Sequence, residues 1–425
     1  MFMRKKALLV GINIKSNQED IAYSMEELEN LAAACGIKSV GQLTQKLERV
    51  NQSHYVGTGK LQELESMLLE QEVDVIIFDD ELSPMQIRNL ESRLDCEVID
   101  RTTLILDIFA ERAKTRESQL QVELAKLRYK LPRLIGSRES LGRQGGGSGL
   151  KNRGAGETKL ELDRRKIEEK ITKLNNELEK IVKQRNIQRK KRVKNESKVV
   201  SLVGYTNAGK STTMNAVLEE NMNEADKKVF EKNMLFATLE TSVRRINTGH
   251  NKEFLLTDTV GFINKLPHHL VKAFRSTLEE VTEADLLVHV IDYSNPNHEQ
   301  QKTLTNEILN EIGIENTPVI YVYNKADLAP RAYPAVEGNN VYLSASNRIG
   351  INELIEVIVK HVFQDDVTSE LLIPYTEGQI VSYFNNNAQV LLEEYEEEGI
   401  RLIVECKVED AEKFKHYLKE NSVKK

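Results

Sequence analysis

Short apolar runs alternate with helical patterns over the first hundred residues, which predicts a small α/β domain over residues 1–103. The strand-like runs are KALLVGINI, a weaker one near residues 39–43, VDVIIFDD and CEVID. Between them, helical spacing is present near residues 20–36, in GKLQELESMLLEQ and in SPMQIRNLESRL. In the last of these, Ser83 is a natural N-cap and Pro84 suits the first helical position.

Two longer apolar stripes predict an antiparallel helical hairpin over residues 104–195. The first stripe lies in a helix expected over 104–131, and both stripes follow a spacing of four, three and four residues. Their members are Leu120, Leu124, Leu127 and Leu131, then Ile167, Ile171, Leu174, Leu178 and Ile181. Residues 136–158 between the helices are predicted to be a flexible loop, because eight of the chain's 22 glycines fall within 136–156.

The remaining sequence predicts two further domains. Residues 198–364 repeat buried strand patterns followed by helices, as in an α/β fold with a mixed, mostly parallel sheet covered by helices on both faces. Residues 365–425 have a net charge of −7 and predict a small acidic α+β domain. We expect there a strand LLIPY, a helix from Gln379 to Phe384, a hairpin strand reaching Val408 and a last helix near 410–418.

The composition of this 425-residue chain indicates where in the cell it is located. It contains no apolar run near the roughly 18 residues that a membrane helix needs, so we expect no membrane span. The N-terminal stretch lacks a small-residue cleavage site, and we expect no export. Cys35, Cys96 and Cys406 are far apart and have no companion ligands, which favours a reducing, cytoplasmic location.

The charge of the chain is unevenly distributed. The net charge is −7, yet residues 111–194 contain 25 Lys and Arg against 11 Asp and Glu, a local +14. Four of these cations, Arg138, Arg143, Lys151 and Arg153, lie in the glycine-rich loop. One interpretation is a solvated helical surface; the one-signed excess favours contact with a polyanion.

A phosphate-binding pattern follows directly from the buried strand KVVSLV. It consists of Gly204, Tyr205, Thr206, Asn207, Ala208, Gly209, Lys210 and Ser211, the order GxxxxGK[ST] between a strand and a helix. Backbone N–H groups of such a loop approach phosphate oxygens, and the lysine binds the β and γ phosphates. The Ser211 hydroxyl can ligate Mg²⁺. This pattern alone occurs both in proteins that bind ATP and in proteins that bind GTP.

A second strand ends in the DxxG arrangement of Asp258, Thr259, Val260 and Gly261. Asp258 can reach Mg²⁺ through a water, and the Gly261 N–H can bond the γ phosphate. The next residue is Phe262, where a glutamine would orient the attacking water. Since phenylalanine cannot do so, we expect slow intrinsic turnover and large stimulation by a partner. We read His268 and His269 as exposed helix-start residues and assign no general base.

The strand TPVIYVYN ends in Asn324, Lys325, Ala326 and Asp327, and here the sequence resembles the P-loop GTPases of the TRAFAC class. By that resemblance Asp327 accepts from guanine and excludes adenine, Lys325 stacks on the base, and Asn324 ties this loop to the phosphate loop. Ser344, Ala345 and Ser346 resemble the last base-contacting loop, with an N–H directed at guanine O6. The ligands implied are GTP, GDP and Mg²⁺.

A threonine before DxxG should complete the Mg²⁺ site, and Thr238 and Thr241 are candidates. The stretch Phe236, Ala237, Thr238, Leu239 and Glu240, followed by Arg244 and Arg245, resembles the FATLD element of the Obg-HflX branch. That resemblance places the role on Thr238 and makes residues 221–238 a first switch that triphosphate orders. Lys210, Thr238 and Gly261 are then the residues implied in catalysis.

The whole chain resembles the HflX family of ribosome-associated GTPases, through the order of its domains, the hairpin tip GGGSGLKNRGAGETKLELDRR, GYTNAGKS, FATLE and DTVGFI. The resemblance implies that the GTP form binds the large (50S) ribosomal subunit, with the hairpin and its loop on ribosomal RNA. It also implies splitting of stalled or idle ribosomes, followed by ribosome-stimulated hydrolysis to GDP. The motifs suggest that a monomer is sufficient for catalysis.

Two other functions stay open. In the first, the N-terminal domain binds ATP through Gly57, Thr58, Gly59 and Lys60 and remodels RNA, although two glycines and a lysine more often form an ordinary turn into a helix. In the second, the protein is a regulatory switch with protein effectors and no RNA partner.

Overall fold

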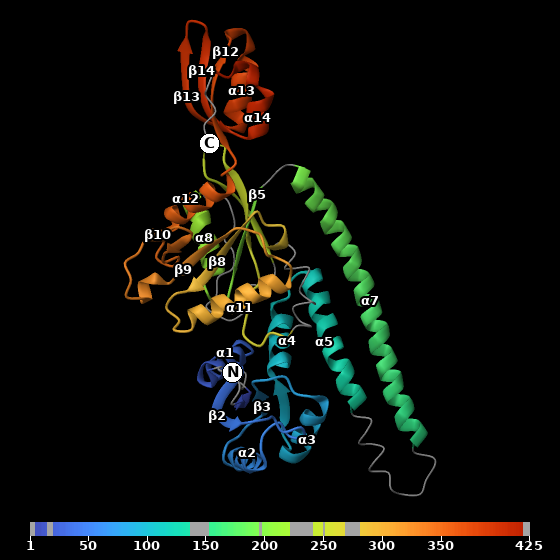
Figure 1. Cartoon of the computed structure of the whole chain (residues 1–425). Coiled ribbons are helices and arrows are strands. Elements are labelled where there is room, and N and C mark those ends of the chain that lie inside the picture. The colour runs from blue at the N-terminus through green and yellow to red at the C-terminus, as the bar shows by residue number, and fades with distance from the viewer. Residues whose placement is uncertain are drawn as a thin grey trace. The chain divides into compact units, whose positions relative to one another are not determined.

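The computed structural model describes residues 5–14, 20–136, 153–194, 198–221, 241–249, 251–267 and 281–419 (Figure 1). These residues form two compact units. The first comprises the described residues up to Arg189 together with 261–267, and the second comprises the other described residues. None of the helices described combines the length and apolarity needed to cross a bilayer.

A four-stranded parallel sheet organises the N-terminal part, in the order β2-β1-β3-β4. Its strands are β1 (Lys6–Ile14), β2 (Lys38–Leu47), β3 (Val75–Phe78) and β4 (Glu97–Asp100). All four were predicted, with β2 longer than expected. The central strands β1 and β3 are buried along almost their whole length, which is why they read as continuous apolar runs.

Four helices accompany this sheet: α1 (Ile21–Ala34), α2 (Thr58–Glu70), α3 (Pro84–Leu94) and α4 (Arg101–Arg112). The predicted start of α3 is confirmed. Ser83 Oγ accepts from the Gln86 N–H at 3.3 Å, and Gln86 Oε1 accepts from the Ser83 N–H at 2.9 Å. This reciprocal pair satisfies two donors at the helix start.

The predicted hairpin is present as α5 (Arg116–Gly136) and α7 (Arg153–Lys194). Leu120, Leu124 and Leu174 are buried between them, with partly buried neighbours Leu127, Ile171, Leu178 and Ile181. The ion pairs Arg116–Glu177 at 2.8 Å and Lys170–Glu123 at 2.6 Å run in opposite order along the two helices, so the pairing is antiparallel.

One prediction for this region was wrong. Residues 104–131 are not one helix, because α4 ends at Arg112 and Ala113 takes an extended conformation. Thr115 Oγ1 then accepts from the Ser118 N–H at 3.3 Å and caps the start of α5. In addition, α7 begins at Arg153, inside the segment that was predicted to be loop.

The central sheet has seven strands in the order β10-β11-β9-β8-β5-β7-β6 and is mostly parallel, as predicted. Its strands are β5 (Lys198–Gly204), β6 (Ser242–Asn247), β7 (Glu253–Asp258), β8 (Leu286–Asp292), β9 (Val319–Asn324), β10 (Ala335–Glu337) and β11 (Asn340–Tyr342). The edge strands β6 and β10 are antiparallel to their neighbours and were not predicted.

Among the described residues, three helices cover this sheet: α8 (Lys210–Asn221), α11 (His298–Glu311) and α12 (Ile351–Val362). A 3₁₀ turn, η1, spans Ala326–Leu328. Val200, Leu256, Val288 and Ile320 from four adjacent strands are fully buried in one apolar cluster. This core holds the strand ends in register for the site described below.

The C-terminal part is a three-stranded antiparallel sheet, in the order β12-β14-β13, with two helices (Figure 1). Its elements are β12 (Val367–Ile373), the 3₁₀ turn η2 (Tyr375–Glu377), α13 (Gly378–Asn387), β13 (Gln389–Glu396), β14 (Gly399–Cys406), α14 (Val408–Lys413) and the 3₁₀ turn η3 (Lys415–Tyr417). The α+β prediction is confirmed, but Val408 starts α14 instead of ending the strand, because Lys407 is its N-cap.

Candidate functional site

Polar residues gather at the carboxyl edge of the central sheet. Gly204, Asp258, Asp292 and Asn324 are the last residues of β5, β7, β8 and β9, and Ser344 follows β11. These five strands are parallel, so their carboxyl ends meet on one side of the sheet. That position is where open α/β sheets bind ligands.

The loop after β5 requires glycine at two points. Gly204 has φ 141°, and a Cβ atom there would lie 2.2 Å from the Val290 carbonyl oxygen. Gly209 has φ 97°, and its Cβ would lie 2.2 Å from Asn324 Nδ2. No side chain fits either place, and the absence of one lets the backbone come close to its neighbours.

Lys210 begins α8 and its amine lies inside the loop. The Nζ donates to the carbonyl oxygens of Gly204 at 3.2 Å and Tyr205 at 2.9 Å. Burial lowers the pKa of Lys210 to about 8, with the Asp258 carboxylate acting against that shift. A buried amine whose partners among the described residues are neutral carbonyls is well placed to pair with an anion entering the loop.

Two oxygens that suit a magnesium ion lie together. Ser211 Oγ, in the first turn of α8, donates to Asp258 Oδ2, at the end of β7, at 2.6 Å. In the described residues, no group of three or more His, Cys, Asp or Glu side chains is placed to hold a metal. Mg²⁺ prefers hard oxygen ligands and usually keeps waters and substrate phosphates, so these two residues fit it without a full protein cage.

The rest of the DxxG segment packs inward. Thr259 Oγ1 donates to the Leu202 carbonyl at 2.7 Å and is fully buried, and Val260 is also buried. The Phe262 side chain is 1% exposed. Its ring is therefore part of the packing and offers no polar group to a water.

Asn324 joins three loops. Its Nδ2 donates to the Ala208 carbonyl at 2.9 Å, and its Oδ1 accepts from the Ala345 N–H at 3.0 Å. The 344–346 loop is closed by the Ser344 N–H, which donates to Ile349 O at 3.0 Å, and by Ser344 Oγ and Ser346 Oγ at 3.2 Å. The phosphate loop and the two loops expected to contact a base are thus fixed to one side chain.

Asp327 lies on η1 beside these loops. Its Oδ1 is buried and has no hydrogen-bond partner among the described residues. A buried acceptor of this kind is costly unless a ligand supplies the donor. The N–H groups of guanine are suitable donors, and adenine presents no matching pair.

Asp292 was missed by the sequence analysis. Its Oδ2 pairs with Lys325 Nζ at 2.6 Å, and its Oδ1 accepts from Ser294 Oγ at 2.6 Å. Lys325 itself has φ 60°, a left-handed conformation. A carboxylate at the end of a buried strand next to the predicted site was the available signal, and it positions the lysine expected to cover a base.

Several predicted residues lie outside the described part of the chain. These are Phe236, Ala237, Thr238, Leu239 and Glu240, the histidines 268 and 269, and the loop cations Arg138, Arg143 and Lys151. The alternative threonine, Thr241, is described and directly precedes β6.

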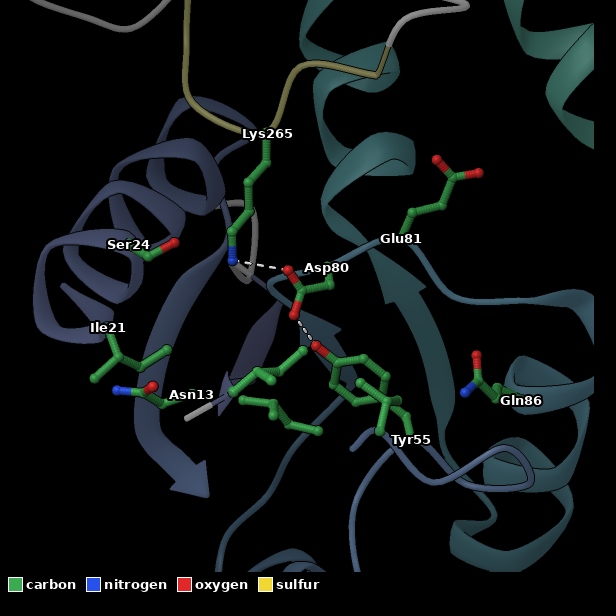
Figure 2. A pocket seen from close by; sticks show the side chains of 11 residues that line it. Asn13, Ile21, Ser24, Tyr55, Asp80, Glu81, Gln86 and Lys265 are labelled. Atoms are coloured by element: carbon green, nitrogen blue, oxygen red, sulfur yellow. Dashed lines mark hydrogen bonds and ion pairs between the residues drawn. The ribbon is translucent and has the colours of Figure 1, made fainter. Parts of the chain in front are cut away.

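A separate cavity of about 270 Å³ lies at the carboxyl edge of the N-terminal sheet (Figure 2). Lys265 reaches into it and pairs with Asp79 at 2.6 Å and Asp80 at 2.7 Å, and the Tyr55 hydroxyl donates to Asp80. Asp79 also pairs with Arg101 at 2.7 Å. Burial opposes ionisation of Asp79, but Arg101 and Lys265 outweigh it and hold its pKa below the usual range.

This N-terminal edge is poorly suited to a nucleotide phosphate. Asp80 and Glu81 line the cavity, and carboxylates repel anions. In the Gly57–Lys60 fragment, the Gly57 N–H donates to Gln45 Oε1 at 2.9 Å and Lys60 pairs with Glu63 at 2.7 Å. Two of the groups that the ATP hypothesis needs, the Gly57 N–H and the Lys60 amine, are therefore already engaged within the chain.

The central sheet, with its phosphate loop and DxxG segment on one edge, is that of a P-loop GTPase domain. Family models agree along the chain: residues 22–110 match the GTP-binding GTPase N-terminal family, 112–192 the GTP-binding GTPase middle region, and 199–325 the 50S ribosome-binding GTPase family. Curated relatives then identify the branch. The chain belongs to the HflX family of GTPases, and it hydrolyses GTP.

Two relatives show how complete the match is. A GTPase HflX of Caldanaerobacter subterraneus subsp. tengcongensis is 44% identical over 415 residues, covering 98% of this chain and 94% of the relative. That of Escherichia coli is 39% identical over 396 residues, covering 92% and 91%. A solved GTP-binding protein from Sulfolobus solfataricus in complex with GDP is 24% identical, covers 85% of this chain and 99% of its own, and has a TM-score of 0.43.

Proposed function

We propose that this protein is a GTP-dependent factor of the large ribosomal subunit that separates stalled or idle ribosomes and is released by hydrolysis. The observation that carries the nucleotide part is the buried Asp327 oxygen, which lacks a partner among the described residues, on the edge that holds Ser211 and Asp258. One end of that edge suits guanine and the other suits a magnesium-bound phosphate.

In this proposal the loop from Gly204 to Ser211 surrounds the phosphates, and Lys210 exchanges its two carbonyl partners for phosphate oxygens. Ser211 and Thr238 ligate Mg²⁺ directly, and Asp258 does so through a water. When bound, the ion neutralises charge on the β and γ phosphates. The Gly261 N–H contacts the γ phosphate.

The base is held by the other set of residues. Asp327 accepts from guanine, Lys325 covers the ring while Asp292 holds its amine, and a backbone N–H of the loop 344–346 donates to O6. Phe262 offers nothing to the attacking water, so we infer that the ribosome supplies or orders the missing group.

The ribosomal part of the proposal rests on charge and shape. The local +14 falls within residues 111–194, which contain the two-helix stalk with its own apolar core, and folded RNA is bound mainly through shape and phosphate. The matching family model is named for 50S binding. We infer a cytoplasmic monomer built of four parts, with boundaries near residues 103, 195 and 364.

Sedimentation with purified 50S subunits tests this partner. The affinity of the protein for the subunits should be higher with a non-hydrolysable GTP analogue than with GDP. It should also fall steeply as the salt concentration rises. The pair Arg138→Gln and Arg143→Gln should weaken binding and reduce the salt slope by up to about 2. The exposed pair Lys360→Gln and Lys415→Gln, outside the hairpin, is the control. Equal loss in both pairs would contradict binding through the hairpin.

Splitting is tested separately, by following intact ribosomes on a density gradient. We expect the GTP form to convert them to free subunits. Ribosomes that bind the protein but stay whole would restrict the function to association.

A further inference from the structure

The β6–β7 hairpin connects the two segments expected to respond to a γ phosphate. β6 starts one residue after Thr241, close behind the predicted first switch, and β7 ends at Asp258. In the antiparallel ladder Ser242 pairs with Asp258 at one end and Asn247 pairs with Glu253 at the other. A movement of the turn along the strands therefore acts on both segments together.

The described residues of the turn of this hairpin are joined by two backbone hydrogen bonds. The Thr248 N–H donates to the Lys252 carbonyl at 3.0 Å, and the Lys252 N–H donates to the Gly249 carbonyl at 3.0 Å. Gly249 and Asn251 take left-handed conformations, with φ 83° and 62°. Positive φ is costly for most residues other than glycine and asparagine, so the turn is specified by its sequence.

Asn251 satisfies the end of a helix in the C-terminal domain. Its Nδ2 donates to the carbonyl oxygens of Asn385 at 2.7 Å and Ala388 at 2.8 Å. Ala388 is the C-cap of α13, and the last carbonyls of a helix lack partners within it. The hairpin turn thus supplies a donor to two carbonyl oxygens at the end of α13, beside the donors that α13 supplies itself through Asn386 and Asn387.

Lys252 makes a second contact with the same domain. Its Nζ pairs with Glu405 Oε2 at 2.8 Å, and the two side chains are only 12% and 29% exposed. Glu405 lies on β14 between Val404 and Cys406, which are both buried in the C-terminal core. The amine is also 5.5 Å from the centre of the Phe363 ring, at the end of α12. Partial burial makes this pair less screened than a surface ion pair.

We propose that the C-terminal α+β domain clamps the β6–β7 hairpin through Asn251 and Lys252 and thereby sets the preference of the nucleotide site for GTP over GDP. This inference rests on the proposed switch roles of the segments that flank the hairpin. The clamp coexists with a site in which Ser211 is bonded to Asp258 and Lys210 to its own loop. Because Ser242 of β6 pairs with Asp258 of β7, a clamp on the turn resists a displacement of the end of β7, and a partner that loosens the clamp favours the GTP form.

The test uses the full-length protein with Asn251→Ala combined with Lys252→Met. Affinities for GDP and for a non-hydrolysable GTP analogue are measured by calorimetry. We expect the ratio of the two affinities to move toward GTP by on the order of fivefold. The control is Arg245→Gln, which removes an ion pair to Glu253 at 3.3 Å within the same hairpin. A ratio equal to that of the control would overturn the clamp.

Two further measurements support the test, one with a variant in the C-terminal domain and one made without nucleotide. Glu405→Gln approaches the same contact from the C-terminal domain, and its effect should not add to that of Lys252→Met. Hydrogen exchange of β6 amides in nucleotide-free protein should be faster in the clamp variants than in the control. If Asp327→Asn and Lys210→Ala lose guanine nucleotides while the clamp variants match the control, only the clamp fails and the proposed nucleotide site stands.

Discussion

The N-terminal and central sheets place charged residues at the same topological position, with opposite outcomes. At the N-terminal edge, Asp79 and Asp80 are paired with Arg101 and Lys265. At the central edge, the Asp327 oxygen has no partner in the described residues. The carboxyl edge of a parallel sheet offers a position for a ligand, and a carboxylate oxygen left without a donor there suits a ligand that supplies one.

The largest effect is expected at the central edge, from Lys210→Ala. The variant removes the cation meant for the β and γ phosphates, and it should weaken GTP binding by about 100-fold or more. Calorimetry measures this directly, with circular dichroism to confirm the fold. Unchanged affinity would remove Lys210 from the site and, with it, the contrast between the two edges.

At the N-terminal edge the expected effect is on stability. Asp79→Asn removes a fully buried charge facing Arg101 and should cost roughly 3 kcal/mol in the free energy of unfolding. The pKa of Asp79 is lower in the folded chain than in the unfolded one. Its contribution is therefore present at neutral pH and is lost as pH falls below about 4.

Chemical unfolding of both proteins between pH 3 and pH 7 would check this. The variant should show a smaller loss of stability in acid than the parent. Equal acid sensitivity would mean that Asp79 is not stabilised by its cations.

The next prediction concerns the selectivity of the central edge for guanine. Asp327→Asn exchanges a carboxylate for an amide, so the preference should move from guanine toward xanthine by about tenfold or more. Competition between GTP and xanthosine triphosphate measures it, with Asp292→Asn as a neighbouring variant that should weaken both nucleotides alike. Retained selectivity for GTP would contradict the assignment of Asp327.

The smallest effect is expected from Lys60→Ala. Lys60 is engaged with Glu63, and α2 starts as an ordinary helix, so neither nucleotide affinity nor RNA-stimulated ATP turnover should change. A clear loss of ATP turnover would instead revive the remodeller with an ATP-binding N-terminal domain.

Sequence reasoning recovered the elements whose cause is local. The strands β1, β3 and β5 are apolar runs, and α3 carries its own capping residues. It failed where the cause lies elsewhere in the fold. The edge strands β6 and β10 form because each pairs with a neighbouring strand. The break at Ala113, in contrast, had a local signal that the prediction overlooked, since Thr115 caps the start of α5.

The site divides in the same way. Gly204, Lys210, Asp258 and Asp327 were predicted from motifs whose spacing is typical of phosphate and guanine binding, and their roles stay predictions. Partnerships between distant segments were not predicted: Asp292 with Lys325, Lys265 with Asp79, and Asn251 with α13 are each made by residues far apart in sequence. No local pattern encodes them, because only the fold brings the partners together.

The most direct test of the whole account is GTP turnover measured with and without purified large ribosomal subunits. With Phe262 in place of a water-orienting residue, turnover of the protein alone should be slow. Large subunits should raise it by about tenfold or more, a barrier change of about 1.4 kcal/mol. Equal turnover in their presence and absence would contradict a ribosome-stimulated switch.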